Sequence, residues 1–258
     1  MDKRIKVVVV GGGYAGVMAA NRVTQRDDVA VTVINPRQAF VPRLRLHQLV
    51  GGTHDAVVDY REVLAEGVEL VVGTAARIDA TARTVTLAEG GSIDYDYLIY
   101  AVGSFSRGPQ VPGAAEFAYP VATLEAAQRL RSVLSDTPVP APVTVVGGGP
   151  VGIETAAELA EQGRGVGLVC GGVLGPNLHP SARRAARKYL TRLGVEVIDG
   201  PDTSVTAVRS GAVELGDGRT LPSQVTIWAA GFGVPDLADP EAVFAPSSTT
   251  ANSARTSS

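Results

Sequence analysis

Cysteine and histidine are scarce in this sequence of 258 residues, with one cysteine, Cys170, and three histidines. A single cysteine cannot form an internal disulfide or a CxxC redox pair, and it cannot supply a cysteine-rich zinc site. Three histidines also argue against a His-rich metal cluster. We therefore expect no metal site and no dithiol redox chemistry.

The chain also lacks a basic excess and long apolar runs. Its formal net charge is -3, which gives no reason to expect nucleic acid as a partner. Lys3, Arg4 and Lys6 precede an apolar run at residues 7–10, but glycines end that run at once, so a buried strand is favoured over a signal peptide. No apolar stretch reaches the roughly 18 residues that cross a bilayer. We expect a cytoplasmic protein without a transmembrane segment.

Glycine, by contrast, is abundant at 30 residues, and its placement shows an internal duplication. An apolar segment at residues 5–10 leads into a glycine turn at 11–16, and the same order recurs at 143–146 and 147–152. Near the end of each half stands a similar segment, "YLIYAVG" at the first and "VTIWAAG" at the second. Each half reads as strand, glycine turn, helix, strand, connection, strand, a small antiparallel sheet and a closing strand.

Hydrophobic periodicity predicts the remaining elements. Helices are expected at residues 17–25, 40–52, 59–65, 123–135, 153–162 and 181–193, and antiparallel pairs at 75–79 with 84–88 and 205–208 with 212–215. The sequence therefore predicts an α/β fold with two Rossmann-like, three-layer dinucleotide-binding domains, each with a small antiparallel β-meander insert, the second nested in the first.

The first glycine turn has the spacing G-x-G-x-x-G at Gly11, Gly13 and Gly16. The first glycine permits the tight turn, the second lets the backbone approach a pyrophosphate, and the third allows close helix–strand packing. The end of the next strand, where an acid usually binds ribose hydroxyls, carries Asn35, which can still accept and donate hydrogen bonds. The alternative is a structural turn without a ligand.

The second glycine turn has the same spacing at Gly147, Gly149 and Gly152, and a turn without a ligand is again the alternative. The following strand ends at Cys170, with no acid that would bind a 2′-hydroxyl or repel a 2′-phosphate. The sequence therefore leaves NADH and NADPH both open. Three arginines on one predicted helix either approach a 2′-phosphate or, as is more common, form a solvated face; they are Arg183, Arg184 and Arg187.

Three further side chains have two readings each. Glu154, expected in the first turn of its helix, either interacts with the helix dipole or lies near a nicotinamide and a flavin. His47 is a candidate proton donor, although a structural or surface histidine is more common. Cys170 is a candidate reactive thiol, although a cysteine at a buried strand end is more often inert.

The ordered segments "VVVVGGGYAGVMAA", "FVPRLRLHQLVGG", "YDYLIYAVGS", "VTVVGGGPVGIETAAELA" and "VTIWAAGF" resemble the FAD-dependent pyridine nucleotide-disulfide oxidoreductase superfamily. Within it the chain is similar to the type II NADH dehydrogenase branch. The resemblance covers residues 5 to about 235, and the missing CxxC separates this chain from the disulfide reductases.

The resemblance implies a role for specific residues. Around FAD it places Gly11, Gly13, Tyr14, Ala15 and Gly16 at the pyrophosphate, Asn35 at the ribose, Ala76 near the adenine, Arg43 in the segment that passes the flavin, and Ala101, Val102 and Gly103 in the crossing strand. Around NAD(P)H it places Gly147, Gly149, Pro150, Val151 and Gly152 at the pyrophosphate, Glu154 near the nicotinamide, as the one catalytic residue, and Ala230 and Gly231 along the site.

The resemblance also sets the expected domains and function. We expect an FAD-binding domain at 1–111, an NAD(P)H-binding domain at 112–235 and a disordered Ser/Thr-rich tail at 236–258. The implied function is hydride transfer from NAD(P)H to FAD and on to a quinone or similar small acceptor. The oligomeric state is left open, and a homodimer is one of the alternatives. After Phe232 the sequence lacks the glycine–aspartate segment of the family, so the FAD site would lack one wall. The alternative is a truncated dinucleotide-binding protein without turnover.

Overall fold

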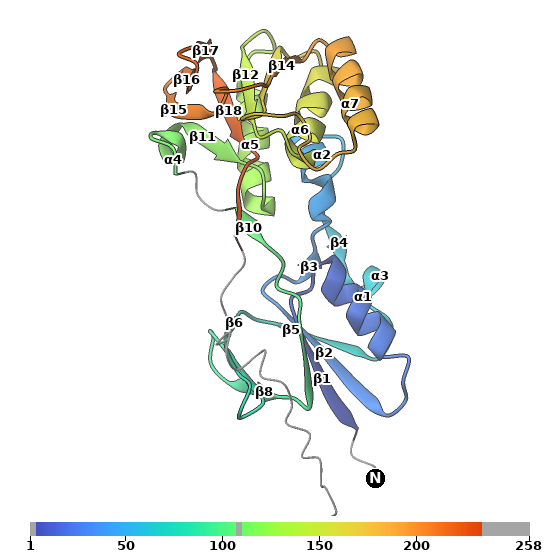
Figure 1. Ribbon diagram of the computed structural model, residues 1–258. Coiled ribbons are helices and arrows are strands. Elements are labelled where there is room, and N and C mark those ends of the chain that lie inside the picture. The colour runs from blue at the N-terminus through green and yellow to red at the C-terminus, as the bar shows by residue number, and fades with distance from the viewer. Residues whose placement is uncertain (1–3, 107–109, 234–258) are drawn as a thin grey trace, which may run out of the picture. The chain divides into compact units, whose positions relative to one another are not determined.

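The computed structural model describes residues 4–106 and 110–233, and these residues form two compact units (Figure 1). The first unit contains residues 4–38 and 64–102, and the second contains residues 39–63, 103–106 and 110–233. The expected tail at 236–258 lies outside the described residues. Segment 39–63 belongs to the second unit, although it falls within the range 1–111 expected for FAD. The assignment of whole ranges to one ligand each stays a prediction.

The first unit is built on a four-stranded parallel sheet in the order β5-β2-β1-β9. Its strands are β1 (Ile5–Val10), β2 (Val29–Asn35), β5 (Val68–Val72) and β9 (Tyr97–Tyr100). The last four residues of β1 are all buried, as a strand covered on both faces requires. Helix α1 (Tyr14–Val23) packs on one face, and a meander of β6 (Ala75–Asp79), β7 (Thr84–Leu87) and β8 (Ser92–Asp94) contributes to the core on the other.

The second unit repeats this plan with one strand more. Its parallel sheet has the order β11-β18-β12-β13-β14, formed by β11 (Ala118–Pro120), β18 (Val225–Trp228), β12 (Val143–Val146), β13 (Val166–Val169) and β14 (Glu196–Ile198). The meander consists of β15 (Val205–Arg209), β16 (Ala212–Leu215) and β17 (Thr220–Pro222). Strand β18 therefore has neighbours on both sides, whereas β9, its counterpart in the first unit, pairs only with β1 among the described residues.

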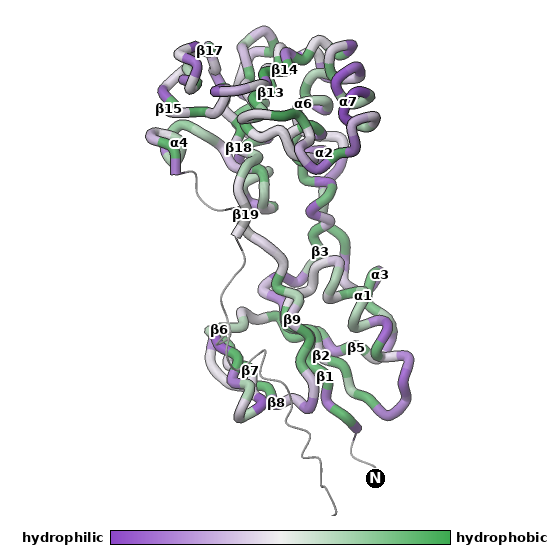
Figure 2. Tube along the Cα trace, viewed as in Figure 1, coloured by the Kyte–Doolittle hydropathy of each residue, from purple (hydrophilic) through white to green (hydrophobic). Residues whose placement is uncertain are grey.

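Three longer helices belong to the second unit, and their ends follow from sequence signals. They are α5 (Leu124–Asp136), α6 (Pro150–Glu161) and α7 (Pro180–Arg192). Thr123 caps α5 by accepting a hydrogen bond from the Ala126 amide at 3.2 Å. Proline opens both α6 and α7, where its missing N–H costs nothing. Figure 2 shows α7 as largely hydrophilic, in keeping with Leu190 as its one buried residue.

Segment 39–63 forms several short elements and not the two helices expected there. It contains β3 (Ala39–Phe40), the 3-10 turn η1 (Arg43–Arg45), α2 (Leu46–Gly51), β4 (Val58–Asp59) and α3 (Tyr60–Val63). Helix α2 ends as predicted at the glycine pair, because Gly52 adopts a left-handed φ of 75°. The expected helix over 59–65 is reduced to four residues, since Asp59 pairs with Ala39 in a strand.

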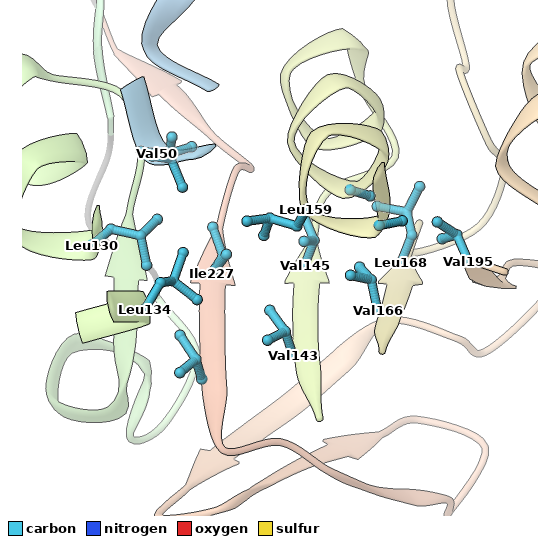
Figure 3. Packing of buried hydrophobic residues seen from close by; sticks show 14 of the residues in the cluster. Val50, Leu130, Leu134, Val143, Val145, Leu159, Val166, Leu168, Val195 and Ile227 are labelled. Carbon is cyan, nitrogen blue, oxygen red and sulfur yellow. The ribbon is translucent and has the colours of Figure 1, made fainter. Parts of the chain in front are cut away.

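The largest buried cluster lies in the second unit and includes part of segment 39–63 (Figure 3). Leu46, Leu49 and Val50 of α2 are each 3% exposed, and Val50 points toward Leu130 and Ile227 in the figure. Helix α2 thus packs into the same core as β12, β13 and β18. The remaining short elements are α4 (Ala114–Phe117) and the antiparallel pair β10 (Phe105–Ser106) with β19 (Phe232–Gly233).

Candidate functional site

The first glycine turn joins β1 to α1, and its three glycines serve different purposes. Gly11 has a φ of 106° and lies so close to the Ala101 carbonyl that a Cβ would overlap it. Gly16 packs equally tightly on the Gly11 carbonyl. Gly13, the residue before α1, is different because a Cβ there would meet nothing within 4 Å. The turn therefore leaves open the approach to the amino end of α1, the position at which dinucleotide-binding folds hold a pyrophosphate.

The second glycine turn joins β12 to α6 and reproduces this geometry. Gly147 has a φ of 132°, and its Cβ would lie 2.9 Å from the Ala229 carbonyl carbon. Gly152 packs on the Gly147 carbonyl, whereas a Cβ on Gly149 would meet nothing within 4 Å. The two turns therefore share tight first and third glycines and an open second glycine. Each has the shape that a dinucleotide pyrophosphate requires.

Asn35 ends β2 and is connected to the first glycine turn. Its Oδ1 accepts a hydrogen bond from the Gly12 amide at 3.1 Å, and its Nδ2 donates to the Arg37 carbonyl at 2.9 Å. An asparagine has two amide hydrogens and two acceptor lone pairs, so hydrogen-bonding capacity remains for a ribose hydroxyl. Asn35 thus orders the turn itself, which the sequence pattern did not predict.

The other residues assigned to FAD occupy varied positions. In the first unit, Tyr14 and Ala15 are exposed at the start of α1, and Ala76 is exposed at a bulge between Ala75 and Arg77. Ala101 contacts Gly11, and Val102 packs against the core of the meander. These placements leave the FAD assignments as predictions.

Arg43, in the second unit, has both terminal nitrogens on backbone carbonyls. Its Nη1 donates to the Ser104 carbonyl at 2.5 Å and its Nη2 to the Ala122 carbonyl at 3.0 Å. Gly103, with a φ of 71°, lies beside this guanidinium. Arg43 therefore connects the η1 turn to the backbone at Ser104 and at Ala122. Its structural role is visible, whereas its role beside a flavin stays a prediction.

Glu154 and His47 form a pair that the sequence did not indicate. Nδ1 of His47, on α2, lies 3.4 Å from Oε2 of Glu154, on α6. The side chain of His47 is 16% exposed and that of Glu154 is 48% exposed. The prediction that Glu154 lies in the first turn of its helix is wrong, because α6 begins at Pro150 and has no acid in that turn. The first of the two readings of Glu154, a contact with the helix dipole, is thus replaced by a histidine partner.

The end of β13 favours the inert reading of Cys170. Burial raises the pKa of this thiol to about 12, nearby Asp199 adds to the effect, and Arg187 opposes it. A thiol with such a pKa holds almost no thiolate at neutral pH, and the thiolate is the reactive form. A Cβ on Gly148 would lie 2.8 Å from the Cβ of Cys170, so the chain here is also closely packed.

The three arginines of α7 considered for a 2′-phosphate do not form one solvated face. Arg187 makes an ion pair with Asp199, and Arg183 donates to the carbonyls of Gly175, Pro176 and Leu178 at 3.3–3.4 Å. Arg184 is exposed. Arg184 is thus the one of the three whose charge no described carboxylate or carbonyl engages.

The remaining residues assigned to NAD(P)H lie around the second turn or at the end of β18. Pro150 opens α6, and Val151 packs on the large core of the second unit. Ala230 packs on the smaller core that contains Trp228, and Gly231 is exposed with a φ of 83°. These positions follow the carboxyl ends of parallel strands, where open α/β sheets bind ligands.

An open cavity of about 360 Å³ lies at the amino-terminal ends of the strands of the first sheet, away from the first glycine turn. It is lined by Arg4, Ile5, Arg83, Asp96 and Tyr97, at the starts of β1 and β9. The glycine turn is at the other end of β1, a six-residue strand that spans roughly 20 Å. This cavity is therefore separate from the dinucleotide-type turn.

The fold and the two turns define a class of α/β proteins with two dinucleotide-binding units in one chain. The sequence identifies the family more narrowly: residues 5–243 match the pyridine nucleotide-disulphide oxidoreductase family, and the chain belongs to it. Proteins described as NADH dehydrogenase-like are among its relatives.

Individual relatives support this placement. An NADH dehydrogenase-like protein of Mycobacterium tuberculosis is 34% identical over 88% of this chain and 62% of its own length. An alternative NAD(P)H-ubiquinone oxidoreductase of Arabidopsis thaliana is 30% identical over 77% of this chain and 45% of its own length. The chain thus spans less than two thirds of the length of these relatives.

Solved structures confirm the fold. The structure of NDH2 from Plasmodium falciparum has a TM-score of 0.75 and 21% identity, covering 90% of this chain and 56% of that one. A sulfide:quinone oxidoreductase from Aquifex aeolicus gives a TM-score of 0.73 over 90% of this chain and 60% of its own. None of the helices in the described ranges combines the length and apolar composition needed to cross a bilayer.

Proposed function

We propose that this protein is an FAD-dependent NAD(P)H oxidoreductase that delivers electrons to a quinone or a similar small acceptor. The observation that supports this most directly is the pair of glycine turns with the same open second glycine, one in each unit. Two such turns suit two different dinucleotides, FAD at one and NAD(P)H at the other. The acceptor is proposed from the quinone named for a relative of 30% identity.

The first turn is proposed to bind FAD. The amino end of α1 presents backbone amides and a partial positive charge to the pyrophosphate, and Gly13 lets the phosphates approach the backbone. Asn35 fixes the turn through Gly12 and retains hydrogen-bonding capacity for the ribose. Ala76 and Ala101 are proposed to lie along the same ligand.

The second turn is proposed to bind NAD(P)H in the same way. Gly149 leaves the approach to α6 open, and Pro150 fixes the first helical residue without using an amide that a phosphate needs. Glu154, one turn further along α6, is proposed to lie near the nicotinamide. Both NADH and NADPH remain candidates, since Arg184 is an exposed arginine of α7 that could approach a 2′-phosphate.

The residues of this chain bind and orient, while the cofactors supply the redox chemistry when bound: hydride passes from NAD(P)H to FAD, and two electrons then pass to the acceptor. The thiol of Cys170 takes no part, because its pKa of about 12 keeps it protonated. The chain holds one cysteine, so no disulfide takes part in this route within one chain.

The test begins with the visible spectrum of the purified protein, after incubation with FAD and removal of the excess. Bound flavin that bleaches with NADH or NADPH under anaerobic conditions, and recovers its colour on addition of a soluble quinone, supports the proposal. Bleaching without recovery would exclude quinones as acceptors. A protein that binds dinucleotides but never reduces flavin would instead be a dinucleotide-binding protein without turnover.

A further inference from the structure

Helix α6 and its C-cap residue carry a row of three polar side chains that contact segment 39–63. Glu154, Glu158 and Gln162 are spaced four residues apart and so lie on one face of the helix. Glu154 pairs with His47 at 3.4 Å. Oε1 of Glu158 accepts a hydrogen bond from the Thr53 hydroxyl at 2.7 Å, and Nε2 of Gln162 donates to the Gly51 carbonyl at 2.7 Å. We call these three contacts the α2–α6 row.

The three contacts of the α2–α6 row differ in what they leave accessible. The contacts of Glu158 and Gln162 join exposed groups at the carboxyl-terminal end of α2 and fasten the two helices. Glu154 lies at the other end of the row, one turn into α6 and nearest to the glycine turn. Its carboxylate is 48% exposed, and His47 is its one partner among the described residues.

His47 itself is held firmly. Its side chain is 16% exposed, and Leu46, directly before it in α2, and Leu49, two residues after it, are each 3% exposed in the core of the second unit. A half-exposed glutamate has several free rotamers, and a fixed partner reduces their number. The buried side of α2 thus anchors a histidine, and the histidine restrains a carboxylate beside the second glycine turn.

We propose that His47 is a positioning residue, which holds the Glu154 carboxylate toward the nicotinamide end of a dinucleotide bound at the second turn. This inference rests on the proposed function of that turn. A carboxylate so held favours the oxidised dinucleotide, whose nicotinamide ring is cationic, over the reduced one, whose ring is neutral. The pair thereby sets the relative affinity for NAD⁺ and NADH.

The test measures the dissociation constants of NAD⁺ and NADH for the full chain by calorimetry, without added FAD. The readout is the ratio of the NAD⁺ constant to the NADH constant. In Glu154→Gln this ratio rises about three- to fivefold, as expected for loss of one half-exposed charge pair. In His47→Leu it rises toward the same value, because the carboxylate loses its restraint.

Two conservative variants make the result specific. His47→Asn keeps an N–H donor close to the position of Nδ1 and restores the ratio of the unaltered protein. Glu154→Asp keeps the charge but shortens the side chain, so the 3.4 Å contact with His47 is lost and the ratio rises. It tests the same contact even if His47→Leu does not fold.

The matched control is Thr53→Val, which removes the hydrogen bond to Glu158 in the same α2–α6 row. A merely structural role for the row would alter the ratio in this variant too, whereas we expect no change. An unchanged or lowered ratio in His47→Leu overturns the inference, as does an unchanged ratio in Glu154→Gln. Failure of the unaltered chain to bind either dinucleotide would instead refute the proposed function of the second turn.

Discussion

At the scale of single residues, Gly13 and Gly149 are positions at which a substitution should affect ligand binding more than folding. A Cβ on Gly13 or on Gly149 would meet no protein atom within 4 Å, whereas the first and third glycines of each turn are packed against backbone. The second glycine is therefore the position at which a methyl group can obstruct a ligand with little effect on the fold.

We expect Gly13→Ala to weaken FAD binding and Gly149→Ala to weaken NAD(P)H binding, each roughly tenfold or more, because the methyl group occupies the path of the pyrophosphate. Each variant loses about 1 kcal/mol or less of stability, since alanine is a poorer N-cap than glycine. Flavin absorbance and dinucleotide calorimetry measure the two affinities. The control is Gly165→Ala, an exposed glycine with equally free space.

Cys170 gives a second prediction at this scale. Because burial raises its pKa to about 12, we expect very slow reaction with a thiol reagent at pH 7.5 and rapid reaction in denaturant. The stability linked to the protonated thiol is complete below the pKa of the unfolded chain, near 9, and is lost as the pH rises toward 12. Since the chain has one cysteine, the reagent reports this site alone. Fast reaction in the folded protein would contradict the burial.

At the scale of elements, α2 joins the core of the second unit although it lies in the first quarter of the chain. Val50 is 3% exposed in the cluster shown in Figure 3, together with Leu130 and Ile227. Val57, a few residues beyond α2, is 44% exposed. The two valines therefore distinguish a packed position from a surface position within segment 39–63.

We expect Val50→Ala to lower the free energy of unfolding of the second unit by about 2 kcal/mol, from two lost methyl groups and the cavity that remains. Val57→Ala should change it by less than about 0.5 kcal/mol. Trp228, the one tryptophan of the chain and 8% exposed, reports this unit in a denaturant titration by fluorescence. Equal effects of the two substitutions would show that α2 does not belong to this core.

At the scale of the whole molecule, the two units have separate cores of unequal size. The largest buried cluster lies in the second unit and has twenty buried residues, whereas the two clusters of the first unit have seven and six. Unfolding of a chain with two cores need not follow a single transition. The sole tryptophan allows the second unit to be followed alone.

We expect the transition seen by Trp228 fluorescence to occur at a higher denaturant concentration than the earlier part of the change in far-UV circular dichroism, which reports both units. A saturating dinucleotide that binds the second turn should move the tryptophan transition further, by about 2.7 kcal/mol at 100 times its dissociation constant. If the fluorescence and circular dichroism curves coincide, both without and with the ligand, the two units unfold as one.

The sequence by itself determined the repeated plan and the positions of both glycine turns. A short apolar run followed by glycines at fixed spacing specifies a buried parallel strand, a tight turn and a helix, because each step depends on local backbone freedom and hydrophobic pattern. The four strands of the first sheet, four of the five strands of the second and the starts of α1 and α5 were accordingly predicted to within a few residues, whereas β11 was not predicted. The family resemblance was confirmed by the match over residues 5–243.

Only the tertiary structure decided which distant residues meet. His47 and Glu154 are 107 positions apart and their elements come from different halves of the duplication, so no local pattern pairs them. The same holds for Asn35 with Gly12 and for Arg43 with the Ala122 carbonyl. Side-chain partners of this kind follow from how buried faces pack, as when the core-facing leucines of α2 bring His47 to α6. Packing, which acts through space rather than along the chain, therefore fixed the details of the candidate site.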